Sequence, residues 1–168
     1  MQIQTIGNRR YFTGFVDKLN PLDIFVFGSN EDGFHGAGAA GYAMRGTSAN
    51  TWRNDPAFLA AMKAPIGSQT RRGKWAVFGI GRGFQQGTEG RSYAIATVTK
   101  PGAKRSIPLR EIAQQLKELG QFASEHPEME FFCAIVGGGY NGYSKEEINK
   151  LYTLWQSAPS NIIFPRIN

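Results

Sequence analysis

The stretch Asp23–Gly41 constrains the fold of this chain most, because a continuous apolar run stops there at a polar, glycine-rich segment. The run Ile24–Phe27 holds β-branched and aromatic residues without polar alternation, which predicts a strand buried on both faces in the sheet of an α/β domain. Gly28 and Ser29 mark the carboxyl end of this strand. The glycines that follow remove Cβ atoms, so that backbone N–H groups approach an anion; they are Gly33, Gly36, Gly38 and Gly41.

Small residues begin a predicted helix at about Ala37, which continues to Met44. A helix N-terminus just beyond the carboxyl end of a strand is a ready phosphate site, and ligands of open α/β sheets collect there. The glycine pattern differs from the dinucleotide fingerprint, which normally lacks the preceding asparagine and the histidine. It also differs from a P-loop, because no Gly-Lys-Ser/Thr follows. The stretch therefore predicts an anion-binding loop of another kind.

Six positions of this stretch resemble the N-x4-HGxGxAG signature of ADP-ribose-binding macrodomains, especially the viral type; they are Asn30, His35, Gly36, Gly38, Ala40 and Gly41. The resemblance implies a three-layer α/β/α sandwich, with a mixed central sheet and helices on both faces. It also implies catalytic roles, in which Asn30 binds the distal ribose and His35 contacts that ribose or orients a water. The residues alone leave two alternatives open. For Asn30 the alternative is a cap of a turn or helix through its side chain, and for His35 it is a loop spacer with a solvent-facing ring.

A second buried strand is predicted over 130–136, and it also ends in glycines. Macrodomains have a second glycine-rich loop here, which clasps the diphosphate and distal ribose opposite the first loop. Asn141 departs from the family pattern, which often has an aromatic residue at that position. The ligand-binding residues that the resemblance implies are Asp17, Gly28, Ser29, Gly36, Ala37, Gly38, Ala39, Gly137, Gly138, Gly139, Tyr140, Asn141 and Gly142.

Two aspartates each have a functional and a simpler structural interpretation. Asp17 is the nearest candidate for the macrodomain aspartate that accepts hydrogen bonds from the adenine amino group, and its alternative is a solvated turn residue. Asp32 is available as a base near the ribose, although an exposed loop carboxylate is the simpler interpretation. The resemblance thus predicts binding of ADP-ribose or a derivative, with hydrolysis of an ADP-ribosyl linkage or a terminal phosphoester as its enzymatic form. The alternatives are a non-catalytic sensor or sponge for such a nucleotide, and a basic nucleic-acid-binding protein.

The remaining pattern alternates strands and helices, as expected for an α/β sheet. Strands are predicted over 2–6, 11–16, 75–80, 92–99 and 161–164, and helices over 56–62, 110–125 and 145–156. Asp55 and Pro56 are expected at the start of one helix, and Ser144 with Glu147 forms a predicted capping box at another. Residues 81–87 are predicted to be a flexible polar loop, which either closes over the ligand or connects a hairpin.

The length of 168 residues predicts a single domain over 1–168, in which residues 47–91 match the macrodomain pattern poorly and form an insertion or elaboration. The net charge of +6 suits polyanionic partners. The expected partners are ADP-ribose or a related nucleotide, with an ADP-ribosylated protein or nucleic acid as further candidates.

A cytoplasmic protein without a membrane partner is predicted, because no apolar run approaches the roughly 20 residues that span a bilayer and no signal core follows the amino terminus. One cysteine, Cys133, excludes an intrachain disulfide and any multi-cysteine zinc site. It lies in an apolar run, which predicts a buried core residue. No metal site or cofactor is predicted.

Overall fold

The computed structural model describes residues 1–14, 16, 19–134, 142–154 and 158–166. Its strands form one mixed sheet in the order β1-β2-β7-β6-β3-β5-β4. The five strands from β2 to β5 in this order pair in parallel, whereas β1 and β4 pair antiparallel at the two edges. The strand bounds are β1 Gln2–Ile6, β2 Arg9–Thr13, β3 Asp23–Asn30, β4 Gly83–Gln86, β5 Arg91–Val98, β6 Glu130–Cys133 and β7 Ile162–Pro165.

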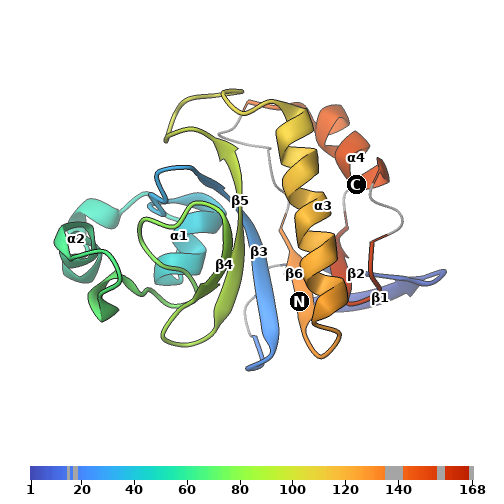
Figure 1. Ribbon diagram of the computed structural model, residues 1–168, viewed down its shortest axis with the longest axis horizontal. Coiled ribbons are helices and arrows are strands. Elements are labelled where there is room, and N and C mark those ends of the chain that lie inside the picture. The colour runs from blue at the N-terminus through green and yellow to red at the C-terminus, as the bar shows by residue number, and fades with distance from the viewer. Residues whose placement is uncertain (15, 17–18, 135–141, 155–157, 167–168) are drawn as a thin grey trace.

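Helices cover both faces of this sheet (Figure 1). The helices are α1 Gly38–Arg45, α2 Pro56–Lys63, α3 Leu109–Glu125 and α4 Lys145–Leu154, with short 3-10 turns at Trp52–Asn54 and Gln69–Arg71. Helices α3 and α4 pack on one face, and α1 packs on the other. The predicted three-layer α/β/α sandwich with a mixed sheet is confirmed.

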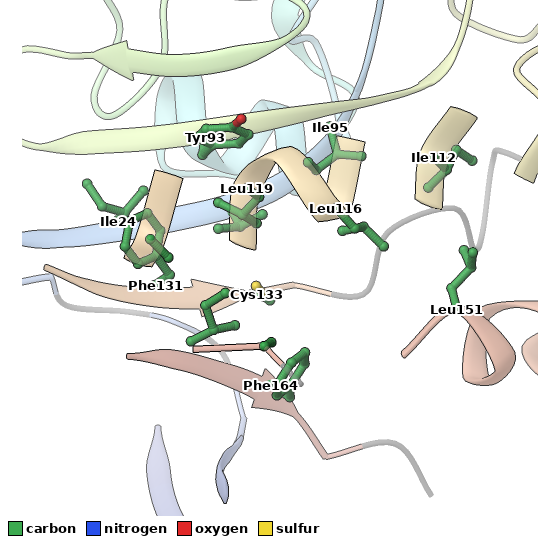
Figure 2. Packing of buried hydrophobic residues seen from close by; sticks show 14 of the residues in the cluster. Ile24, Tyr93, Ile95, Ile112, Leu116, Leu119, Phe131, Cys133, Leu151 and Phe164 are labelled. Carbon is green, nitrogen blue, oxygen red and sulfur yellow. The ribbon is translucent and has the colours of Figure 1, made fainter. Parts of the chain in front are cut away.

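Strand β3 is buried on both faces, as its apolar run predicts. Ile24 and Val26 face the helix α3 side, where they meet strand residues such as Phe131 and helix residues such as Leu119 (Figure 2). Phe25 and Phe27 face the opposite side and belong to the cluster that contains α1. All four side chains from Ile24 to Phe27 are at most 4% exposed. Because neighbouring side chains alternate between the two faces of a strand, a continuous apolar run fits β3, which is covered on both faces.

The predicted strand over 75–80 is wrong. This segment forms only an isolated bridge between Arg72 and Val77. Its apolar residues are buried for another reason: Trp75 packs against Phe25 and Tyr42, with ring centroids 5.5 and 5.4 Å away. The amides of residues 74 and 75 donate to carbonyl oxygens of Met44 and Ala43 near the carboxyl end of α1. The segment thus closes the end of a helix instead of joining the sheet.

The predicted flexible loop over 81–87 is also wrong, since it contains the edge strand β4. Apolar alternation is weak there because a polar residue occupies the buried position. Gln85 is 1% exposed, and its side chain accepts from the Val77 amide at 2.7 Å and donates to the Ile80 carbonyl at 2.7 Å. A buried glutamine whose amide group is hydrogen-bonded at both ends holds the preceding segment against β4.

Two predicted helix starts are confirmed by their caps. The Asp55 carboxylate accepts hydrogen bonds from the amides of Ala57 and Phe58 at the start of α2. At the start of α4, the Ser144 amide donates to Glu147 Oε1 at 3.0 Å, and the Glu147 amide donates to Ser144 Oγ at 3.2 Å. These reciprocal bonds are the predicted capping box.

Gly81 brings the segment over 47–91, called the central segment below, into contact with the end of β3. A Cβ atom on Gly81 would lie 2.0 Å from the Asn30 carbonyl oxygen, which is backbone and unable to yield cheaply. We expect Gly81→Ala to lower the free energy of unfolding by about 1–3 kcal/mol, as for other overpacked positions. Urea unfolding measures this, with Arg82→Ala at the exposed next residue as a control expected to stay within about 0.5 kcal/mol. Equal stabilities of the two variants would contradict this packing.

Candidate functional site

Strand β3 ends at the point where the chain changes direction across the sheet. From β3 the chain passes through α1 to β5 on one side, and from β5 through α3 to β6 on the other side of β3. Such a switch point leaves a crevice beyond the carboxyl ends of the strands. A cavity of about 720 Å³ is found there, a size typical of small-molecule sites. It is lined by Gly28, Ser29, Asn30, Phe34, Gly36, Ala37, Gly38, Ala39, Ala40, Asn50, Trp52, Arg53, Val98, Pro101, Gly102 and Lys104.

The ligand-binding residues predicted in the first loop all line this cavity. Ala37 is the N-cap of α1, with extended backbone and no side-chain cap. Within the described part of the chain, the amides of Ala39 and Ala40 in the first helical turn have no hydrogen-bond acceptor. The Gly38 amide, in contrast, donates to the Ser48 carbonyl at 2.9 Å, so it is already engaged. The anion-binding capacity of the loop therefore lies in the first turn of α1.

Asn30 lines the cavity and also closes a turn through its side chain. Its Nδ2 donates to the Phe34 carbonyl at 2.8 Å, and its Oδ1 accepts from the Phe34 amide at 3.0 Å. The turn-capping alternative of the sequence analysis thus describes contacts that are present. One further N–H of Nδ2 and one further lone pair of Oδ1 stay available to a ligand.

His35 lies beneath the loop and is not among the cavity-lining residues. Its ring is fully buried and stands edge-on to Phe27, with ring centroids 5.3 Å apart. Nε2 lies 2.9 Å from the Ile80 carbonyl oxygen, and Nδ1 lies 3.0 Å from Ser29 Oγ. Because a carbonyl oxygen only accepts, Nε2 carries the proton and Nδ1 accepts from the Ser29 hydroxyl. The alternative of a solvent-facing spacer is wrong.

Burial sets the protonation state of this imidazole. Desolvation lowers the pKa of His35 from 6.5 to about 4, against the opposing effect of its contacts with Ile80, Val77 and Gln85. The ring is therefore neutral at pH 7, consistent with the tautomer that its partners require. In this arrangement His35 connects β3, through Ser29, to the central segment, through Ile80.

Arg45 joins the two walls of the cavity. Its Nη2 donates to the Gly36 carbonyl and to the Ala49 carbonyl, each at 2.8 Å, and Nη1 lies 3.7 Å from Asp55 Oδ2. The Arg45 side chain is only 8% exposed. A nearly buried guanidinium with its fixed fork of donors therefore holds the first loop against the segment that carries Trp52.

Several lining residues were not predicted from the sequence. Trp52 and Arg53 come from the central segment, and the Arg53 guanidinium lies over the Trp52 ring at 4.3 Å. Lys104 comes from the turn that follows β5. No carboxylate side chain lines the cavity, so its charged lining groups among the described residues are Arg53 and Lys104. The sequence signal for these two cations is weak, since neither belongs to a recognisable binding motif.

The remaining predicted site residues fall into two groups, those outside the described residues and those that do not line the cavity. Asp17 and residues 137–141, which comprise Gly137, Gly138, Gly139, Tyr140 and Asn141, lie outside the described residues. Gly142 does not line the cavity, although a Cβ atom built on it would approach Lys104 Cβ to 2.9 Å. Asp32 is exposed and does not line the cavity.

Other kinds of site have little support in the described ranges. No group of three or more His, Cys, Asp or Glu residues there is placed to hold a metal ion. Cys133 is buried, as predicted, and burial raises its pKa, so its thiol is protonated at pH 7. No helix among the described residues is both long and apolar enough to cross a membrane.

Comparisons with solved structures give an informative match. No protein-family model matches the chain, and no curated protein sequence matches it. Among solved structures, the macrodomain of Thermus aquaticus DarG is similar, with a TM-score of 0.52 and 14% identity. The match covers 94% of this chain and 99% of that one. At this identity the likeness concerns the fold: the chain, with its mixed seven-stranded sheet and its helices on both faces, has a macrodomain fold.

Proposed function

We propose that this protein binds ADP-ribose or a derivative in the cavity at the carboxyl end of β3. The observation that carries the proposal is the coincidence of the predicted first-loop residues with one cavity of about 720 Å³ beside the N-terminus of α1. Unoccupied amides of Ala39 and Ala40 suit a phosphate group, since helix N-termini favour anions. The macrodomain fold supports the same ligand class.

The other walls suit the remaining parts of such a ligand. Trp52 and Phe34 supply aromatic surface against which a base or sugar packs. Arg53 and Lys104 add positive charge that complements the diphosphate. Asn30 retains a donor and an acceptor for ribose hydroxyls. We propose that the second loop, with Gly137 to Gly142, completes the site, and that Asp17 contributes to adenine recognition.

As an enzyme, the protein would hydrolyse an ADP-ribosyl linkage or a terminal phosphoester of the bound ligand. Asn30 would hold the distal ribose by hydrogen bonds. The site would then accelerate hydrolysis by orienting the reacting groups and by stabilising the charge that develops in the transition state. His35 would act indirectly, because both ring nitrogens are engaged and its low pKa makes it a weak base. A sensor or sponge would use the same contacts without turnover.

The test is calorimetric titration of ADP-ribose into the protein, with the ligand recovered and identified by chromatography. We expect saturable one-to-one binding, and about a 10-fold loss of affinity in Trp52→Ala, the cost of about 1–3 kcal/mol for a lost aromatic stacking partner. Separate incubations with ADP-ribosylated protein and with ADP-ribose 1''-phosphate reveal turnover as released ADP-ribose. No heat and no thermal shift at millimolar ADP-ribose would overturn the proposal. Salt-dependent binding of an RNA oligonucleotide in that case would favour the nucleic-acid alternative.

A further inference from the structure

The turn over 100–106 between β5 and α3 forms one wall of the cavity and contains an unusual backbone conformation. Pro101, Gly102 and Lys104 line the cavity. Arg105 has φ +56°, and among the described residues it is the only one other than glycine with positive φ. Such a conformation is unfavourable for a residue with a long side chain, and it persists where surrounding contacts impose it.

Contacts of the Arg105 side chain supply that constraint. Its guanidinium donates to both carboxylate oxygens of Glu147, at 2.9 and 3.0 Å, and to the Gly142 carbonyl at 3.2 Å. It also lies over the Tyr143 ring, 4.6 Å from its centroid. Hydrogen bonds from Arg105 hold the pKa of Glu147 at about 2, so the carboxylate stays ionised at neutral pH. The paired fork of donors and acceptors fixes direction as well as distance.

The same turn is fastened at a second point. The Tyr143 hydroxyl donates to the Ile107 carbonyl, and the Thr99 amide donates to Ser106 Oγ at 2.8 Å. The second bond closes the turn on itself, whereas the bonds of Arg105 and Ile107 attach the turn and the residue after it to the segment around the start of α4. These contacts are independent of the first loop.

Lys104, the residue before Arg105, belongs to the cavity wall. Its ammonium has no ion pair or hydrogen bond among the residues that the structure describes. Adjacent cations thus have different surroundings, since Arg105 is bound to Glu147 while Lys104 is available to a ligand. A lysine that has no ion pair within the described ranges, and that lines the same cavity as the first turn of α1, is suited to a phosphate oxygen as a compact point charge.

We propose that Lys104 binds the phosphate of the ligand and that Arg105, held by Glu147, is a positioning residue that aims the turn into the cavity. This inference rests on the proposed function for the identity of the whole ligand. It deepens that proposal by assigning an anion contact to Lys104 and a positioning role to Arg105, both outside the macrodomain signature. The probes are ADP-ribose and inorganic pyrophosphate.

Calorimetric titrations of four variants test the proposal. Lys104→Gln is expected to weaken ADP-ribose binding about 10-fold and to flatten its salt dependence, because one phosphate contact is lost. Lys100→Gln, at an exposed lysine of the same turn that does not line the cavity, is the matched control, with affinity expected within about twofold. Glu147→Gln weakens the Arg105 pair but keeps a capping box, since glutamine also serves there. It is expected to weaken binding about 3- to 5-fold, as a positioning effect smaller than the loss of the contact itself.

The double variant Lys104→Gln/Glu147→Gln separates positioning from general loosening. If Glu147 acts through Lys104, the double variant binds no more weakly than Lys104→Gln alone. Affinity of Lys104→Gln within twofold of wild type, or an undiminished Glu147→Gln effect in the double variant, would overturn the proposal. If the protein binds pyrophosphate in a Lys104-dependent way but not ADP-ribose, the proposed function fails and this inference stands. Binding of neither probe overturns both.

Discussion

Replacing Ala37 with aspartate is expected to stabilise the protein while reducing its affinity for ADP-ribose about 100-fold. Ala37 is the N-cap of α1, and it offers no side-chain acceptor to the helix. Its φ of −148° and ψ of 174° are already the extended conformation of a capping residue, so aspartate requires no backbone change. Its carboxylate would accept from the amides of Ala39 or Ala40, which have no acceptor in the described part of the structure. Capping should add about 1 kcal/mol to the free energy of unfolding.

The same carboxylate would take the place proposed for a ligand phosphate. The ligand would lose charge-assisted hydrogen bonds to the helix N-terminus, each worth about 1.5–3 kcal/mol, and would face a like charge. Since about 2.7 kcal/mol corresponds to a 100-fold change, loss of one or two such bonds gives the expected decrease. Urea unfolding of the variant measures the expected gain in stability, and calorimetric titration of the same preparation measures the expected loss of ADP-ribose affinity.

Ala37→Asn is the matched control, because asparagine caps as well as aspartate but carries no charge. It should be comparably stable and should retain more of the affinity, so that the difference between the two variants measures the charge. Unchanged ADP-ribose affinity in Ala37→Asp would exclude the N-terminus of α1 as the phosphate site. A loss of stability in both variants would instead show that the space at Ala37 is too small for a capping side chain.

Strands could be predicted from the sequence where the pattern of apolar residues matches the burial that the fold imposes on them. Ile24–Phe27 is apolar on both faces because both faces of β3 are covered, and the continuous apolar run in the sequence predicts this burial. Trp75 is equally apolar, but its burial comes from contact with the ring of Phe25, which lies far away in the chain. Gln85 is polar yet buried, since its partners are amide and carbonyl groups of a segment that the pattern does not place. Periodicity alone does not distinguish these cases.

The site could also be predicted only in part, where its residues are close together in the sequence. The first loop could be predicted because its glycines and helix start are contiguous in the sequence. Trp52 and Lys104 reach the cavity from two other segments, and only the fold brings them together. His35 shows how a residue with a reactive side chain is misjudged from sequence: its spacing marks the loop, but its depth and its two partners are set by tertiary packing.

Replacing His35 with alanine is therefore expected to lower the free energy of unfolding by about 3 kcal/mol. The variant removes a fully buried ring and leaves the Ser29 hydroxyl without its partner, whereas the Ile80 carbonyl loses one of two hydrogen bonds and keeps the one from Gln85. An unsatisfied buried polar group costs about 1–3 kcal/mol, and the vacated space adds to this. Urea unfolding at pH 7.5 measures the change. The same substitution at His126, the other histidine of the chain, is the control and should alter stability by about 0.5 kcal/mol at most, because this ring is partly exposed.

The burial of His35 should make the free energy of unfolding of the wild-type protein decrease at acidic pH. The folded-state pKa of His35, about 4, is below the unfolded value of 6.5, so the unfolded chain binds more protons between these values. Its contribution to stability is therefore complete above pH 6.5 and decreases as the pH falls to about 4, by about 3 kcal/mol in total at 1.36 kcal/mol per pKa unit. His35→Asn, which keeps hydrogen-bonding groups but does not titrate, should lack this component, while His126→Ala should retain it. Parallel pH profiles of wild type and His35→Asn from pH 7.5 to 4.5 would show that His35 does not titrate as its burial requires.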